Sequence, residues 1–528
     1  MFFYNMLAII SLTLCVAVAM YLGIVLKRKF SYWKKKDVPH LKPTSLLGDH
    51  HDYILLRKFI GHSTQDICRK FPNEPYIGIY YGWEPALLVQ DPETIKTIMT
   101  KDFYYFNSRE ISKYTHNEVT TQNIFFTYGN RWKVLRQNLT PLFSSAKLKN
   151  MFYLIQKCDM VFEKLLDEET AMSPVLEAKS LMARYTMDCI GSCAFGIETD
   201  TMGKQAEKNP FTRMGNVIFD ISNVRGFKQI ARVVWPSIFY GLGFKTFPTD
   251  IDKFFTKLLT GVFESRQYEP SSRNDFVDLV LGLKKNNHVT GDDISNMKTG
   301  AREKISLEVS NDLLVAQCVA FFAAGFETSA TTMSFTLYEL AKCEEAQTRA
   351  IEEVDEYLRK HEGKVEFDCV TDLPYLDACI DEALRFYPVL AMLTREVVED
   401  YTLPSGLLLE KNMRIHIPVY HLHLNAEHFP EPEQYRPERF FGEEKRKIKP
   451  YTYMPFGEGP RICIGLRFAK MQMLAGLVTV LKKYRVQLAD GMPKRVEMEP
   501  RAFVIQAREA INLKFVKRPD WEQRVFKF

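Results

Sequence analysis

Cys463 lies in a glycine-rich segment, Pro455 to Gln472, whose composition could hold a reactive or metal-binding thiolate. Three glycines surround it: Gly457, Gly459 and Gly465. Glycines adopt positive φ angles and let a flat cofactor approach the backbone, and the N–H groups of such a loop can donate to sulfur and stabilise its anion. Phe456 could pack beside the sulfur, and Arg461 could bind a carboxylate. A free cysteine is more often an inert core residue, so the segment alone does not decide.

A second candidate group, Ala324 to Ser329, interrupts a long helical pattern that runs from about Ser310 to Ala341. Gly325 costs about 1 kcal/mol in mid-helix relative to alanine, so a helix that accepts it could need close approach to something flat. Thr328 can donate to a carbonyl of the preceding turn and loosen the helix locally. Periodicity alone favours a polar interruption of a core helix.

Two further pairs have helical spacing. Glu382 and Arg385 stand three residues apart and would share one helix face; in isolation, a weak exposed ion pair is the favoured interpretation. Trp132 and Arg136 stand four residues apart, which fits an amphipathic helix with one buried tryptophan.

The elements that must position these residues are mostly helical. Helical patterns occupy 132–150, 151–168, 176–194, 250–266, 310–342, 344–360, 374–386 and 466–484. The segment 75–91 alternates around β-forming residues and a Gly-Trp turn, which predicts a hairpin. Strands and turns are also expected in 393–420 and in the last 40 or so residues. We therefore predict a mainly α fold with a minor β component.

Composition supports a globular body and excludes some classes of function. Of 528 residues, 46% are hydrophobic, and no long linker or repeat divides the chain. The net charge of +5 is small for this length and argues against a general nucleic-acid binder. The ten cysteines are scattered, without the paired spacing of a zinc site, which indicates a reducing compartment.

The N-terminus predicts a membrane anchor. Residues 1–26 carry no charged side chain, and the apolar run ends at Lys27, Arg28 and Lys29. Such a run covers the roughly 30 Å of a bilayer core, and the basic cluster would keep the following chain cytosolic. A cleaved signal peptide is the alternative, since Ala17 to Ala19 resembles a cleavage site. We expect an anchor at 1–26, a basic, proline-containing linker at 27–45 and one catalytic domain at 46–528.

The segment around Cys463 resembles the haem-binding signature of the cytochromes P-450, F-x-x-G-x-R-x-C-x-G. Its fixed positions are Phe456, Gly459, Arg461, Cys463 and Gly465. The resemblance implies that Cys463 is the axial thiolate ligand of haem b iron. It also implies a single large cytochrome P-450-type haem domain, preceded by one N-terminal transmembrane helix.

Other motifs extend the resemblance along nearly the whole chain. Ala324 to Ser329 is similar to the oxygen-activation motif, in which Thr328 would hold a water or the bound oxygen and Glu327 would help supply protons for O–O cleavage. Glu382 and Arg385 match E-x-x-R, and Arg439 matches the P-x-R-F element that completes a structural network with them. The resemblance places Trp132, Arg136 and Arg395 at the haem propionates.

Longer stretches resemble insect microsomal enzymes of family 6, which often oxidise plant toxins and insecticides. The resemblance implies mono-oxygenation of a lipophilic small molecule in the endoplasmic reticulum membrane. Electrons would come from NADPH–cytochrome reductase, with a cytochrome b-type donor as a second candidate, because the chain lacks a G-x-G-x-x-G fingerprint. Candidates for a basic docking face, with a solvated charged surface as the alternative, are Lys133, Lys445, Arg446, Lys447 and Lys470.

Three alternatives stay open. An endogenous hormone or lipid hydroxylase would use the same residues on another substrate. A haem-thiolate isomerase or dehydratase would need neither dioxygen nor reductase. A haem or gas sensor would bind without turnover. The sequence names no substrate, regioselectivity or oligomeric state.

Overall fold

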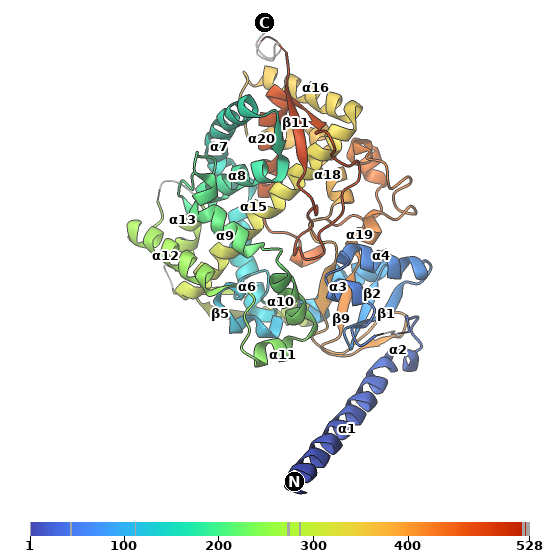
Figure 1. Cartoon of the computed structure of the whole chain (residues 1–528). Helices are drawn as coiled ribbons and strands as arrows, with labels where there is room; N and C mark the ends of the chain where they lie inside the picture. The colour runs from blue at the N-terminus through green and yellow to red at the C-terminus, as the bar shows by residue number, and fades with distance from the viewer. Residues whose placement is uncertain are drawn as a thin grey trace.

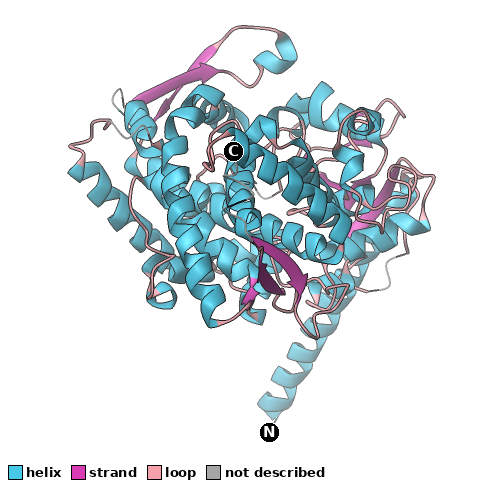
Figure 2. Cartoon of the chain, turned by 90° about the horizontal axis from the view of Figure 1, so that it is seen from above, coloured by secondary structure: helices cyan, strands magenta, loops and turns pink. Residues whose placement is uncertain are grey.

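Helices form most of the molecule (Figure 1), and the computed structural model describes residues 2–42, 45–110, 112–271, 275–284, 287–519 and 523. Seen from above, helices fill the centre and strands lie towards the edges (Figure 2). The predicted mainly helical architecture with a minor sheet component is confirmed.

The α-helices of the N-terminal half are α1 (Phe2–Phe30), α2 (Tyr32–Lys35), α3 (His51–Ile54), α4 (Ile60–Lys70), α5 (Pro92–Lys96), α6 (Gly129–Leu139), α7 (Ser145–Met172), α8 (Ala178–Ile190), α9 (Pro210–Ile218), α10 (Asn223–Val234), α11 (Pro236–Gly241) and α12 (Thr249–Ser265). Those that follow are α13 (Phe276–Lys284), α14 (Asn296–Thr299), α15 (Asn311–Lys342), α16 (Glu344–Lys360), α17 (Cys369–Asp372), α18 (Pro374–Phe386), α19 (Val419–His423) and α20 (Leu466–Lys483).

The strands form small sheets. Their bounds are β1 (Tyr76–Tyr81), β2 (Glu84–Val89), β3 (Val175–Glu177), β4 (His288–Asp292), β5 (Lys304–Glu308), β6 (Leu393–Glu396), β7 (Tyr401–Thr402), β8 (Leu408–Leu409), β9 (Arg414–Ile417), β10 (Tyr484–Leu488) and β11 (Asn512–Lys517). The largest sheet has the order β1-β2-β9-β6, and a second has the order β10-β11-β3. The predicted hairpin is confirmed as β1 and β2, which pair antiparallel with Tyr81 opposite Glu84.

Helix α15 is the core of the molecule. It begins where the Ser310 side chain accepts a hydrogen bond from the Leu313 N–H, a helix cap that the sequence supplies directly. Apolar residues occupy most of its faces, and it packs against α8, α18 and α20. Among the helices whose side chains are all described, α15 is the one with the length and hydropathy of a membrane span, but most of it is buried inside the protein.

A glycine lets three of these helices meet. A Cβ atom on Gly476 of α20 would lie 2.5 Å from Cε1 of Tyr185 in α8 and 2.6 Å from Cε of Met333 in α15. Because glycine has no Cβ atom, α20, which follows Cys463, can approach the core helix this closely.

Two predicted helix boundaries were wrong. We expected one helix to end at residue 150 and the next to begin at residue 151. The structure instead ends α6 at Leu139, continues through a 3-10 turn at Thr140–Phe143, and begins α7 at Ser145. Pro141 explains the shift, because it has no N–H to donate within a continuous helix.

Helix α1 projects away from the body in Figure 1 and leads directly into a buried contact. Trp33 of α2 is fully buried, and its Nε1 donates to the Ile79 carbonyl of β1 at 2.9 Å. A Cβ atom on Gly78 would lie 2.4 Å from the Trp33 ring. The predicted anchor and linker include positions outside the described residues, namely Met1, Pro43, Thr44 and several side chains of α1. The predicted domain division stays a prediction.

We predict that Gly476→Ala lowers stability while Gly261→Ala, its matched control, does not. Overpacking a core costs about 1 to 3 kcal/mol, and alanine in place of glycine returns up to about 1 kcal/mol of helix propensity. Gly261 in α12 has open space around its would-be Cβ atom, so there only the favourable contribution remains. Thermal denaturation of both variants checks this; equal midpoints would show that the junction is not tightly packed.

Candidate functional site

The loop that carries Cys463 has its shape set by its own backbone. It lies between a 3-10 turn, Gly459–Arg461, and the start of α20. The Cys463 N–H donates to the Phe456 carbonyl at 2.9 Å. Gly459 has φ +69°, and a Cβ atom there would lie 2.0 Å from the Met99 carbonyl oxygen. Only glycine fits this position, for both backbone and steric reasons.

The Cys463 thiol is exposed, yet protein surrounds it on the inside of the molecule. An exposed side chain in such surroundings faces an internal space. Burial raises the pKa of Cys463, while the N–H of Gly465 and the charges of Arg136 and Arg109 lower it. The protein alone therefore favours the protonated thiol, and a coordinated metal ion would deprotonate it.

Four arginines gather beside this space: Arg109, Arg136, Arg395 and Arg461. Arg461 is buried; its Nε donates to the Asn107 carbonyl at 2.8 Å and its Nη2 to the Thr127 carbonyl at 2.5 Å. Its guanidinium also lies over the Trp132 ring, 4.7 Å from the centroid.

Burial and mutual repulsion destabilise the charged form of these arginines. Burial, then the charge of Arg109, lowers the pKa of Arg395 to about 9. Burial lowers the pKa of Arg109 to about 10, and the pKa of Arg461 falls well below its ordinary value, again mainly through burial.

The cluster fits a dianionic cofactor. Within the described part of the chain, Arg136, Arg395 and Arg461 form no ion pair with a carboxylate, and the buried Nε of Arg395 has no hydrogen-bond partner. Buried charges need opposite charges. The two propionates of a haem would supply them, next to a thiol able to bind its iron. The residues present therefore fit the haem group that the sequence predicts.

Helix α15 brings Thr328 and Glu327 to the site, with different surroundings. The Thr328 hydroxyl donates to the Ala324 carbonyl at 2.5 Å, as its sequence position predicts. Ala324 is exposed although it lies within the core helix, so it too borders an internal space. Glu327 is buried and forms an ion pair with Lys179 of α8 at 2.6 Å.

Gly325 has a packing role that the sequence did not predict. A Cβ atom there would lie 2.5 Å from Cδ1 of Ile190, so the glycine lets α15 pack against α8. Close approach of this residue to something flat stays a prediction.

Glu382, Arg385 and Arg439 come together in the interior. Arg385 donates to both carboxylate oxygens of Glu382, at 2.7 and 2.8 Å, and both side chains are fully buried. Arg439 lies 3.4 Å from the same carboxylate. The pair is therefore not the exposed ion pair that spacing alone favoured. Backbone carbonyls of His423, Pro432 and Gln434 accept the remaining Arg385 donors.

Sequence reasoning missed two residues of the site. Arg109 lies in a segment without regular periodicity, and its guanidinium stacks on Phe125 at 4.1 Å. Lys179 stands at the start of α8, far in sequence from its partner Glu327. No local sequence pattern marks either residue, because both join the site only through the folding of the chain.

Comparisons with known proteins agree with this geometry. A sequence model of the family described as "Cytochrome P450" matches residues 39–515. The chain is 36% identical to cytochrome P450 6B2 of Helicoverpa armigera, over 93% of this chain and 95% of that protein. It is 35% identical to cytochrome P450 6k1 of Blattella germanica, over 96% of both chains. It is 33% identical to cytochrome P450 6a2 of Drosophila melanogaster, over 95% of this chain and 98% of that protein.

We predict that Arg395→Leu has opposite effects on the two forms of the protein. Without haem it removes a buried cation with an unpartnered donor, which raises stability by about 1 to 3 kcal/mol. With haem it removes a charge-assisted bond, so haem dissociates about tenfold faster. Thermal unfolding and haem transfer to an acceptor protein measure the two effects. Arg508→Leu, at an exposed ion pair with Glu497, is the control and changes neither. Equal effects of both variants would contradict the propionate assignment.

Proposed function

Because the chain belongs to the cytochrome P450 family, it is a haem mono-oxygenase, and we propose that it oxidises lipophilic foreign compounds such as plant toxins or insecticides. The observation that carries the chemistry is the Cys463 thiol, open to an internal space beside four buried or partly buried arginines, of which Arg136, Arg395 and Arg461 form no ion pair with a carboxylate among the described residues. Similarity to insect family 6 enzymes along nearly the full length supports the substrate class.

Each residue has a proposed task in holding the cofactor. Cys463 binds the iron, and Phe456, partly buried in the same loop, packs beside the sulfur. Arg461, Arg395, Arg136 and Trp132 bind the propionates, and Arg109 joins them. When bound, the haem would supply activation of dioxygen: with two electrons from the reductase and two protons, one oxygen atom would enter the substrate and the other would leave as water. Glu382, Arg385 and Arg439 form the structural support.

Thr328 and Glu327 take part in proton delivery. The Thr328 hydroxyl, now bonded to Ala324, can turn to hold a water molecule at the substrate side of the cofactor. Glu327 lies next to it and is linked through Lys179 to the buried side chain of Gln506. Lys179 is about one quarter exposed, so protons from solvent can reach the Glu327 carboxylate along this path.

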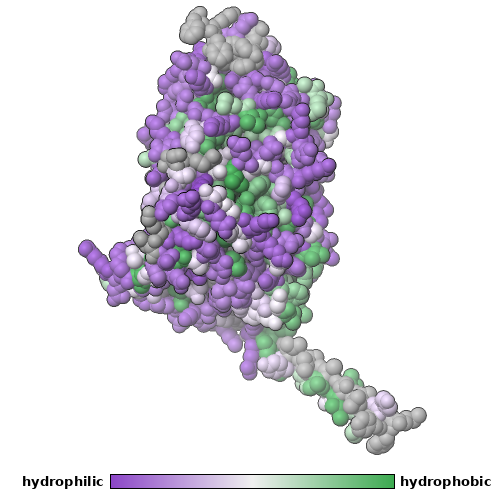
Figure 3. All heavy atoms as spheres, turned by 90° about the vertical axis from the view of Figure 1, so that its left-hand side faces the viewer, coloured by the Kyte–Doolittle hydropathy of each residue, from purple (hydrophilic) through white to green (hydrophobic). Residues whose placement is uncertain are grey.

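Membrane attachment by α1 is part of the proposal. A helix of 29 residues is about 43 Å long, which exceeds a bilayer core. Its described apolar side chains, such as Leu12 and Leu14, are about two thirds exposed, and basic residues fill its last turn. Apolar atoms also gather on the body near the base of α1 (Figure 3). This arrangement favours the endoplasmic reticulum membrane and NADPH–cytochrome reductase as electron donor, with a cytochrome b-type donor as a second source.

A turnover screen tests the function. Full-length protein is reconstituted with the reductase in lipid vesicles and supplied with NADPH and dioxygen. Plant toxins, insecticides and insect hormones are offered separately, and product is measured against NADPH used. We expect hydroxylated products from the first two groups. Coupled turnover of hormones alone would replace the substrate assignment. Product formation without NADPH or dioxygen would instead indicate an isomerase or dehydratase.

We predict that Cys463→Ala prevents normal haem incorporation. The variant loses the one thiol in this loop, and with it the thiolate that can ligate iron, while the arginines remain. The reduced protein with carbon monoxide should then lack the absorbance band of a thiolate-ligated haem. An unchanged band in this variant would refute the ligand assignment.

We predict that Thr328→Ala separates oxygen use from product formation. Losing one hydrogen bond of roughly 1.4 kcal/mol lowers the share of NADPH electrons found in product by about tenfold. Thr332→Ala, one turn further along α15 with an equivalent bond to the Thr328 carbonyl at 2.8 Å, is the control and keeps coupling unchanged. Equal coupling in wild type and Thr328→Ala would exclude the proposed role.

A further inference from the structure

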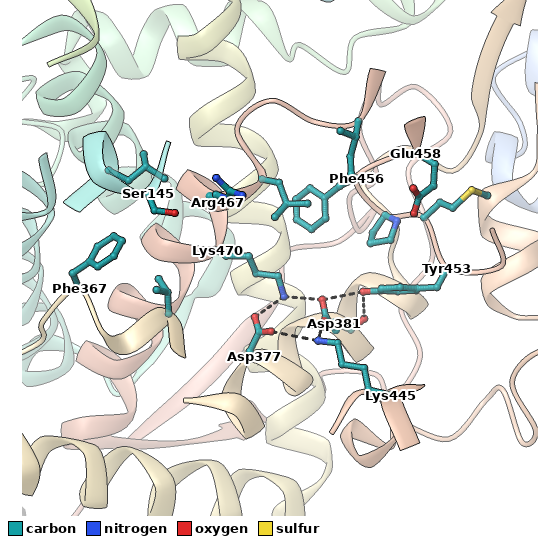
Figure 4. Close-up of a pocket in the computed structure, with 17 residues that line it drawn as sticks. Ser145, Phe367, Asp377, Asp381, Lys445, Tyr453, Phe456, Glu458, Arg467 and Lys470 are labelled. Atoms are coloured by element: carbon teal, nitrogen blue, oxygen red, sulfur yellow. Dashed lines mark hydrogen bonds and ion pairs between the residues drawn. The ribbon is translucent and has the colours of Figure 1, made fainter. Parts of the chain in front are cut away.

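A pocket of about 470 Å³ lies beside the Cys loop, which we define as residues 453–465, on the side of Phe456 (Figure 4). Apolar side chains, including Leu148, Phe367 and Phe456, line part of it. The charged residues that line it are Asp377, Asp381, Lys445, Glu458, Arg467 and Lys470. Four of these charges form one network, and that network involves the chain on both sides of Cys463.

Lys470 is not the free docking residue that its sequence position suggested. Its Nζ lies 2.6 Å from Oδ1 of Asp377 and 2.7 Å from Oδ1 of Asp381. The Lys470 side chain is only 14% exposed. This lysine stands in the second turn of α20, so it connects the chain that leaves Cys463 to helix α18, which carries both aspartates.

Tyr453 connects the other end of the Cys loop to the same aspartate. Its hydroxyl donates to the Asp381 backbone carbonyl at 2.8 Å and to Oδ1 at 3.1 Å. The Tyr453 ring packs against Phe440, with centroids 4.5 Å apart. In Figure 4 the Tyr453 ring and the Lys470 chain reach Asp381 from different sides.

We propose that Asp381 is a positioning residue for the sulfur of Cys463, because its carboxylate holds the chain on both sides of the Cys loop. This inference rests on the proposed function only in taking Cys463 as the iron ligand. Electron donation by a ligating sulfur depends on the hydrogen bonds and packing around it. A loop tied at both ends to one rigid helix keeps those contacts fixed.

Charge favours the same assignment. Burial would raise the pKa of Asp381, but Lys470 and Lys445 outweigh it and hold the pKa below its ordinary value. Lys445 is more than half exposed and lies 3.4 Å from Asp381, so it contributes less than the buried Lys470.

Asp377 offers a matched comparison. It forms the same kind of ion pair with Lys470 but has no hydrogen bond to Tyr453 in the described structure. Substituting either aspartate by asparagine removes one charge from α18 and one partner from Lys470. Only Asp381→Asn also alters the contact with Tyr453. If Asp381 only joined α18 to α20, the two asparagine variants would behave alike.

The test uses full-length, haem-loaded protein. Asp381→Asn, Asp377→Asn and Tyr453→Phe are reduced under carbon monoxide, and conversion of the thiolate-type absorbance band to the band of a thiol-ligated haem is followed with time. We expect conversion about tenfold faster in Asp381→Asn and in Tyr453→Phe, and near the wild-type rate in Asp377→Asn. The haem reduction potential should shift to more positive values in the first two variants only.

Three results would overturn the inference. One is equal conversion rates in the two asparagine variants. Another is a lowered denaturation temperature in Asp381→Asn with an unchanged band and potential. The last is a wild-type conversion rate in Tyr453→Phe, which loses one hydroxyl and serves as the decisive variant if Asp381→Asn does not fold. If the wild type itself shows no thiolate-type band, the proposed function fails, which distinguishes that failure from this one.

Discussion

The buried positive charge around Cys463 is the constraint on which the site depends. Moving arginines out of water is costly unless opposite charge accompanies them. Arg395 and Arg461 are nearly inaccessible, and burial depresses the pKa of both. With the propionates placed as proposed, a dianionic cofactor would relieve the unfavourable electrostatic free energy of these buried arginines. Cofactor binding and stability of the interior are thus linked, as for any ligand that binds only the folded state.

The structural network and the Cys loop are mechanically connected through one histidine. The His423 carbonyl accepts from Arg385 at 3.0 Å, and its Nε2 accepts from the Met454 N–H at 2.9 Å. Burial, then the charge of Arg385, lowers the pKa of His423 to about 3, so the ring is neutral and can accept. The Glu382–Arg385 pair therefore reaches the start of the Cys loop through a single residue, although it lies far from Cys463 in sequence.

Features encoded over a few residues could be predicted from the sequence. The hairpin before residue 91, the core helix from 311 and the back-bond of Thr328 all follow from local spacing or local chemistry. Features that depend on distant neighbours could not. Gly325 leaves space for the Ile190 side chain, and Glu327 forms an ion pair with Lys179. Arg109 enters the cluster only because the chain folds it there. The helix boundary near 140 was missed because the helical pattern was followed across Pro141.

The buried Trp33 has a consequence for how the enzyme would meet its partners. Only six residues separate the end of the uncharged stretch, Leu26, from this fully buried ring. With α1 in a bilayer, as proposed, this short connection keeps the catalytic domain close to the lipid surface. An electron donor anchored in the same membrane then reaches the enzyme by diffusion in two dimensions, and each protein has a high effective concentration for the other. Oily compounds dissolved in that lipid are gathered into the same thin layer.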